Sequence, residues 1–110
     1  MERVLWIETN GKMKVVELEE DAFLRGLQLL VAGNIEVLPI APDLALIVNE
    51  EGLLLDLEYN LVASQFMNMH LVGDAVLCSI GLRDGEMDII GLTPNFVELA
   101  KQILDKRNPS

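Results

Sequence analysis

Two glycine-containing dipeptides at tight-turn positions constrain the fold of this chain more than any other sequence feature. Asn10-Gly11 and Asp84-Gly85 each lie between two short runs rich in strand-forming residues. Such dipeptides supply the positive backbone angles that a tight hairpin turn requires. Strands joined by so few residues must be antiparallel, because a parallel connection needs a crossover of about a dozen residues or more. The sequence therefore predicts two β-hairpins.

Further strand-like and helix-like stretches extend this pattern along the chain. The strand-like runs are residues 4–7, 13–18, 35–40, 44–48, 75–82 and 87–90. Apolar residues at helical spacing predict helices over residues 21–32, over 60–69 and from Pro94 onward. Gly33 is placed to cap the end of the first helix, whereas Asn60 and Thr93 are placed to cap the starts of the second and third.

The resulting order is strand, strand, helix, repeated three times. It predicts an α+β fold with a mainly antiparallel sheet of about six strands and three helices, in the order ββαββαββα. A chain of 110 residues has material for one compact core. We therefore expect a single domain over residues 1–107, with a short tail at 108–110.

Composition excludes several classes of protein. Hydrophobic residues make up 51% of the chain, which is enough to offset chain entropy and excludes disorder. The net charge of −10 repels phosphate backbones, so we expect no direct DNA or RNA binding and no binding to anionic membranes. No stretch predicts a signal peptide or a membrane span. The large apolar fraction favours a homo-oligomer, in which some of this surface is covered.

The residues needed for catalysis or metal binding are few. The chain has one cysteine, Cys78, and one histidine, His70, which together cannot form a zinc site. A lone cysteine favours a reducing, cytoplasmic setting. Cys78 lies inside an apolar strand, where a thiol is usually an unreactive core residue. The sequence therefore predicts no enzyme activity, no metal and no cofactor.

A stripe of neutral polar residues marks the second predicted helix. Asn60, Ser64 and Asn68 are four residues apart and share one face, and Gln65 lies beside them. Amides and hydroxyls both donate and accept hydrogen bonds, which suits contacts to a nucleobase or sugar edge, or to a symmetry-related helix. An ordinary polar outer face with Asn60 as a cap is the alternative.

Cations are absent from the middle of the chain. No Lys or Arg occurs between Arg25 and Arg83, whereas that span holds seven acidic residues. A bound phosphate would therefore need Arg83 or Arg25, with Asn49 and Glu50 closing the pocket. The predicted ligand-binding residues are Asn49, Glu50, Asn60, Ser64, Gln65, Asn68, Arg83 and Arg25. Alternatively, the acidic residues form a solvated face.

Four segments carry a resemblance to a known family. They are residues 27–37, 45–52, 60–63 and 72–76. The helix-Gly-strand junction at Gly33 and the Asn49-Glu50-Glu51-Gly52 turn are its most specific parts. Over about residues 20–98, the chain resembles a family of small proteins described as a domain of unknown function, carried largely by bacteriophages, plasmids and other mobile elements of bacteria.

The resemblance implies an accessory protein of a mobile element that acts in the cytoplasm of the bacterial host. By analogy with other small phage proteins, it favours a non-enzymatic counter-defence protein that sequesters a small nucleotide-like immune signal as a homo-oligomer. The alternative is an acidic inhibitor that mimics DNA and binds a host nucleic-acid-binding protein.

Overall fold

The computed structural model describes residues 1–107, except for the side chains of residues 100, 101 and 103–107. The predicted tail at 108–110 lies outside the described residues. In chain order the elements are β1 (Glu2–Ile7), β2 (Met13–Leu18), a 3₁₀ turn η1 (Glu20–Ala22), α1 (Phe23–Val31), β3 (Ile35–Ala41), β4 (Leu44–Asn49), α2 (Leu61–Met67), β5 (Ala75–Arg83), β6 (Glu86–Ile90) and α3 (Pro94–Arg107).

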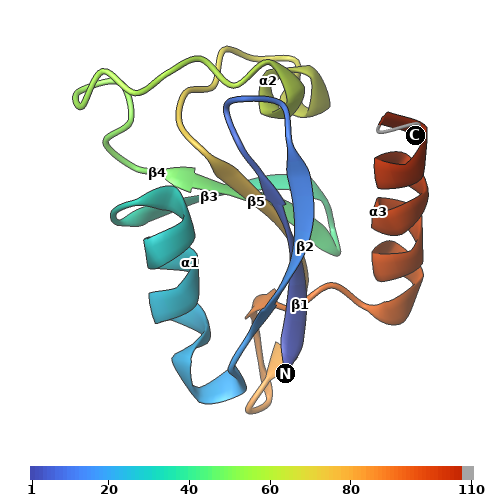
Figure 1. Ribbon diagram of the computed structural model, residues 1–110. Coiled ribbons are helices and arrows are strands. Elements are labelled where there is room, and N and C mark those ends of the chain that lie inside the picture. Colours follow the sequence, from blue (N-terminus) through green and yellow to red (C-terminus); the bar gives the residue numbers. More distant parts are fainter. Residues whose placement is uncertain (108–110) are drawn as a thin grey trace.

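One six-stranded antiparallel sheet forms the centre of the molecule (Figure 1). Its strand order is β2-β1-β5-β4-β3, and β6 pairs with the second half of β5. Every strand pair is antiparallel. The predicted α+β class and the ββαββαββα order are therefore confirmed.

Both predicted hairpin turns occur. Gly11 has φ +87° and Gly85 has φ +83°, values that glycine adopts without steric cost. Asp84 is also left-handed, at φ 52°. The turn at Asp84-Gly85 therefore has positive φ at both central residues, as a two-residue turn with the twist of the flanking strands requires.

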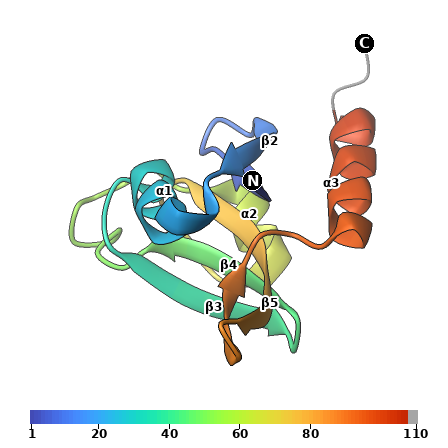
Figure 2. The same ribbon diagram turned by 90° about the horizontal axis from the view of Figure 1, so that it is seen from below.

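Helices cover both faces of the sheet. α1 lies on one face, and α3 lies on the other against β1 and β2 (Figures 1 and 2). Phe23, Leu27 and Val31 of α1 belong to one core cluster, which includes Val76 and Cys78 of β5. The other cluster joins residues of α2 and α3 to the opposite face of β1, β4 and β5. Because β4 and β5 are central and covered on both faces, their sequences are apolar at successive positions.

The first helix ends differently from the sequence-based prediction. The expected helix over 21–32 is divided into η1 and the shorter α1. Ala32, rather than Gly33, adopts the left-handed conformation at the helix end, with φ 62°. Its N–H donates to the carbonyl oxygen of Gln28, as does that of Gly33 at 3.0 Å. An alanine therefore occupies a position that usually favours glycine.

Candidate functional site

Two residues of the polar stripe predicted on the second helix, Asn60 and Ser64, point into the protein. Asn60 is fully buried and Ser64 is only 5% exposed. Asn60 caps α2 by accepting a hydrogen bond from the Ala63 N–H at 3.0 Å, and its amide donates to the carbonyl oxygens of Ile7 and Gly73. These bonds join α2 to β1 and to the segment before β5. A contact face and an ordinary polar outer face both require surface positions, and these two residues are buried instead, although Asn60 is the predicted cap.

Ser64 is likewise occupied by the backbone. Its hydroxyl donates to the Leu71 carbonyl oxygen at 3.2 Å and accepts from the Leu71 N–H at 2.9 Å. Asn68 ends α2 in a left-handed conformation with φ 52° and is exposed, as is Gln65. The stripe thus consists of two structural residues and two surface residues.

Asn49 also has a structural role. It is 5% exposed, its amide donates to the carbonyl oxygens of Val31 and Ala32, and its side-chain oxygen accepts from the Glu51 N–H at 2.7 Å. Asn49 therefore satisfies carbonyl groups at the end of α1 and shapes the turn that follows β4. Glu50 beside it is exposed.

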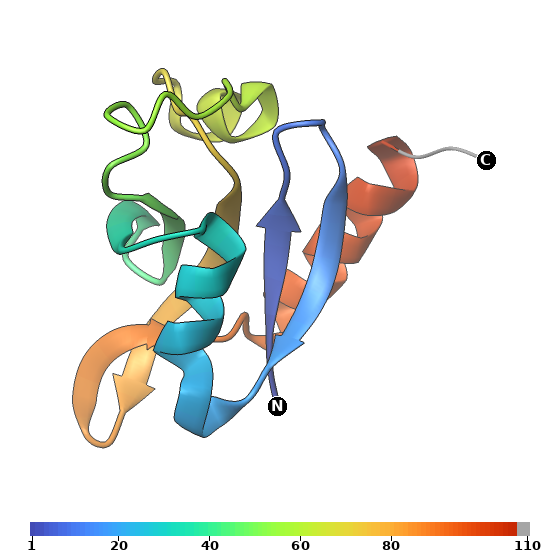
Figure 3. The same cartoon turned by 60° about the vertical axis from the view of Figure 1, so that its left-hand side comes forward.

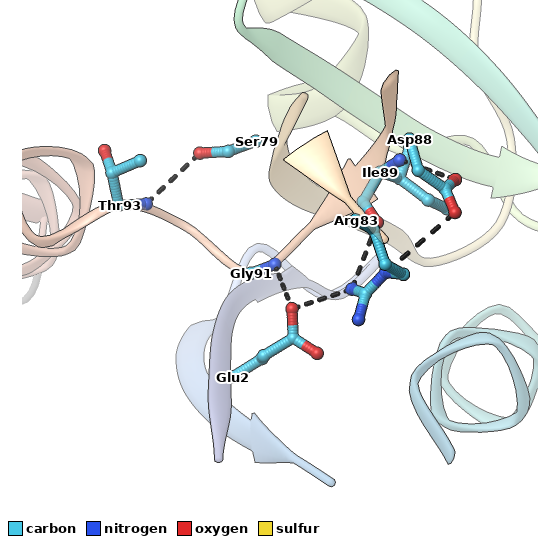
Figure 4. Close-up of polar contacts among 7 residues, drawn as sticks. All are labelled: Glu2, Ser79, Arg83, Asp88, Ile89, Gly91 and Thr93. Carbon is cyan, nitrogen blue, oxygen red and sulfur yellow. Dashed lines mark hydrogen bonds and ion pairs between the residues drawn. The ribbon is translucent and has the colours of Figure 1, made fainter. Parts of the chain in front are cut away.

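Arg83 is held by carboxylates of its own chain (Figure 4). Its Nη2 donates to Glu2 Oε1 at 2.8 Å and to the Ile89 carbonyl oxygen, while Nε lies 3.9 Å from Asp88 Oδ2. The guanidinium also stacks over the Phe23 ring at 5.1 Å. The hydrogen bond to Glu2 raises the pKa of Arg83. A phosphate would have to compete with these contacts.

The predicted ligand-binding residues do not meet in one pocket of a single chain. The side chain of Asn60 reaches Ile7, which pairs with Ala75 at the start of β5. Arg83 is the last residue of β5, and an extended strand places it about 26 Å from Ala75 at the other end. Arg25 is exposed on α1, across the sheet from α2. Ligand binding by these residues stays a prediction.

A surface that the sequence analysis did not single out lies between β4 and α2. Residues 50–56 form a hydrogen-bonded turn, which we call the leucine turn. Leu53, Leu54 and Leu55 are consecutive there and are 76%, 85% and 54% exposed. In Figure 3 this segment projects beyond the end of the sheet. The sequence pattern that could have indicated this surface is a run of three leucines inside an acidic loop.

A cavity of about 440 Å³ opens beside the leucine turn. Its apolar lining includes residues of the turn, of β3 and β4, and of the segment after α2: Leu38, Val48, Leu53, Leu54, Met69 and Leu71. Glu36, Glu50 and Glu51 also line it. His70, another lining residue, stacks on Tyr59 with ring centroids 4.8 Å apart. The site is an apolar hollow bordered by carboxylates.

The carboxylates between residues 36 and 74 form no ion pair with a cation in the part of the chain that the structure describes. Within the described residues, ion pairs join Arg3 to Glu17, Lys14 to Glu8, and Arg83 to Glu2 and Asp88. None of these pairs involves the seven acidic residues between 36 and 74, which are Glu36, Asp43, Glu50, Glu51, Asp56, Glu58 and Asp74. All but Asp74 are exposed. Their negative charge is therefore available to a partner.

Reactive groups are scarce in the described part of the chain. Burial is the main cause that raises the pKa of the Cys78 thiol to about 12, with smaller contributions from Asp88 and Glu2. Cys78 is therefore protonated at neutral pH and is a poor nucleophile. The described residues contain no cluster of His, Cys, Asp or Glu suited to a metal ion. None of the helices in this region has the length and apolarity to cross a bilayer.

The fold and this surface define a small, acidic α+β domain with a carboxylate-bordered apolar hollow. The chain belongs to the family designated DUF3846, a domain of unknown function, whose model matches residues 1–106. This match confirms the resemblance noted from the sequence, whereas an origin in mobile elements stays a prediction. No curated protein and no solved structure matches the chain.

Proposed function

We propose that this protein is a non-enzymatic binding protein that inhibits a basic, nucleic-acid-binding protein of a bacterial host by covering its positively charged surface. The observation that carries the proposal is the set of seven acidic residues between 36 and 74 that form no ion pair among the described residues. The family resemblance implies a setting, the host cytoplasm, and analogy with other small phage proteins adds a role in countering host defence.

Unpaired carboxylates suit recognition of a cationic surface. They attract a basic partner over a distance of roughly 8 Å at physiological ionic strength and speed its encounter. They also need not break internal ion pairs before they bind. The acidic residues come from several segments, including β3, the β3–β4 turn and the leucine turn, so they present charge over an area rather than at a point.

The same geometry gives less support to sequestration of a nucleotide-like signal. The amides of Asn49 and Asn60 and the hydroxyl of Ser64 already bond to backbone groups, so base recognition would leave those groups unpaired. Arg83 is engaged by Glu2, and every acidic residue near the hollow would repel a phosphate. We therefore favour the protein-binding alternative.

Capture from bacterial lysate followed by a DNA-displacement assay tests this function. The immobilised full chain is expected to retain a basic nucleic-acid-binding protein at about 0.05 M NaCl and to release it near 0.5 M, because salt screens exposed charges. The purified captured protein should lose fluorescently labelled DNA when the chain is added in stoichiometric amount, measured by anisotropy.

Paired charge variants provide the control. Replacing Glu50 and Glu51 by Gln should weaken capture and displacement by about tenfold or more, since two unpaired charges are lost. Glu17→Gln should have little effect, because Glu17 lies on β2 and is paired with Arg3. The proposal fails if the captured protein keeps its DNA, or if both variants behave alike.

A further inference from the structure

We infer that the hollow beside the leucine turn is a docking site for an amphipathic helix of the partner protein, one with a leucine-type apolar stripe flanked by Lys and Arg. This inference rests on the proposed function and names the part of the partner that is recognised. The supporting observations are the exposed leucines, the cavity that Leu53 and Leu54 help to line, and nearby carboxylates that form no ion pair among the described residues.

The leucine turn presents its side chains on an ordered backbone. Leu55 N–H donates to the Glu51 carbonyl oxygen at 2.9 Å, and Leu57 N–H donates to that of Gly52 at 3.1 Å. The side chain of Asn49 fixes the start of the turn by accepting from Glu51 N–H. The backbone that carries the exposed leucines is therefore fixed by hydrogen bonds.

Close packing holds the turn against the body of the protein. A Cβ atom added at Gly52 would lie 3.0 Å from Val72 Cγ2 and 3.4 Å from the Val72 carbonyl oxygen. The backbone of the turn thus approaches the segment before β5 closely at Gly52. A surface organised in this way loses little conformational freedom when a partner binds, which favours affinity.

The shape of the site suits apolar anchors of a helix. Leu53 and Leu54 stand at the border of the hollow, while Leu38, Val48 and Leu71 extend the lining into the core that β3, β4 and α2 share. A helix that docks in an apolar groove inserts side chains spaced three or four residues apart. Met69, which is 48% exposed, adds an adaptable contact surface.

The negative charge around the hollow favours a basic partner over a second copy of this chain or an anionic lipid. Glu36, Glu50 and Glu51 line it, and no Lys or Arg occurs from residue 26 to 82. A second copy of this chain carries the same charge of −10 and would bring like charges together. Anionic lipid would be repelled for the same reason. A basic protein segment is the occupant that this charge attracts.

Binding of a designed probe peptide to the full chain tests the inference. The probe is a synthetic peptide of about 18 residues, or five helical turns, with Leu on one face and Lys and Arg on the other. The control peptide has the same composition in a scrambled order, so that it has no apolar face. Titration calorimetry should show the amphipathic peptide binding about tenfold more tightly than the scrambled one, and circular dichroism should show it becoming helical.

Substitutions in exposed leucines locate the site without disturbing the core. Replacing Leu53 and Leu54 by Ser should weaken binding of the amphipathic peptide by about tenfold or more. Leu82→Ser is the matched control, because Leu82 is 69% exposed on the β5–β6 hairpin, away from the hollow, and should leave binding unchanged. Unfolding curves of both variants should match the parent.

The possible failures are distinguishable. If both peptides bind equally and only the Glu50 and Glu51 variant weakens them, the docking site is wrong while the acidic-surface function stands. If light scattering shows a dimer that the Leu53 and Leu54 variant dissociates, a second copy covers the hollow and the inference is overturned. If the Glu50 and Glu51 variant captures the lysate protein as well as the Glu17→Gln variant does, the proposed function itself is overturned.

Discussion

At the scale of single residues, the buried asparagine amides connect distant parts of the chain by hydrogen bonds, a role that their positions in the sequence do not indicate. Asn60 satisfies one backbone donor and two backbone acceptors from three segments of the chain. A residue of this kind cannot be replaced by a smaller one without leaving buried groups unpaired. Asn60 therefore connects the start of α2 to β1 and to the segment before β5 inside the protein.

Asn60→Ala is expected to destabilise the protein by about 3 kcal/mol, the sum of a lost helix cap and two unpaired carbonyl groups. Urea denaturation measures the change. Gln65→Ala on the exposed side of the same helix should stay within about 0.5 kcal/mol of the parent. Equal stability of the two variants would contradict the structural role of Asn60.

A substitution of Ala32 is expected to stabilise the protein. Its φ of 62° is costly for a residue with a Cβ atom, so Ala32→Gly should stabilise the protein by about 0.5 to 1 kcal/mol. Asn68→Gly is the control, because asparagine tolerates the left-handed region better and should gain less. An unchanged or lower midpoint of urea denaturation for Ala32→Gly would show that α1 ends differently.

At the scale of elements, the junction between β1 and the end of β6 depends on Glu2. Its Oε1 accepts from both Arg83 Nη2 and the Gly91 N–H, and Leu92 N–H donates to the Arg3 carbonyl oxygen close by. The β5–β6 hairpin and the start of α3 are thereby tied to the first strand. Figure 4 shows the two contacts of Glu2, with Arg83 and with Gly91.

Removing the Glu2 carboxylate should loosen that junction. Glu2→Ala is expected to cost about 2 kcal/mol, because it removes the acceptor that Arg83 Nη2 and the Gly91 N–H share, whereas Glu2→Gln retains an acceptor oxygen and should cost about half as much. Hydrogen exchange should also become faster at Gly91. Glu86→Ala, an exposed carboxylate on β6, should have an effect near zero.

At the scale of the whole molecule, net charge opposes the compact state. The chain carries −10, and the acidic residues between 36 and 74 repel one another without an ion pair to offset them among the described residues. The charge available for a partner is thus also a cost to the free protein.

Added NaCl should therefore stabilise the protein by about 1 kcal/mol between 0.01 and 0.5 M, because screening reduces this repulsion. Thermal unfolding at several salt concentrations measures the trend. The variant with Gln at positions 50 and 51 should be less sensitive to salt than the parent. A melting temperature that falls with salt would mean that attractive ion pairs dominate.

The sequence by itself determined the order and kind of the elements. Asn10-Gly11 and Asp84-Gly85 predicted the hairpins, and helical spacing predicted the helices, because turn chemistry and periodicity act over a few neighbouring residues. The same local signal placed Asn60 at the start of α2. These parts of the fold are specified by interactions that a short window of sequence contains.

Only the tertiary structure decided which polar residues remain free. Asn49, Asn60 and Ser64 bond to backbone groups of distant segments, and Arg83 reaches Glu2 from the other end of the chain. In the leucine turn, by contrast, apolar residues stay exposed, beside carboxylates that form no ion pair within the described part of the chain. Exposure and hydrogen bonding depend on where remote strands meet, and a local pattern does not contain that information.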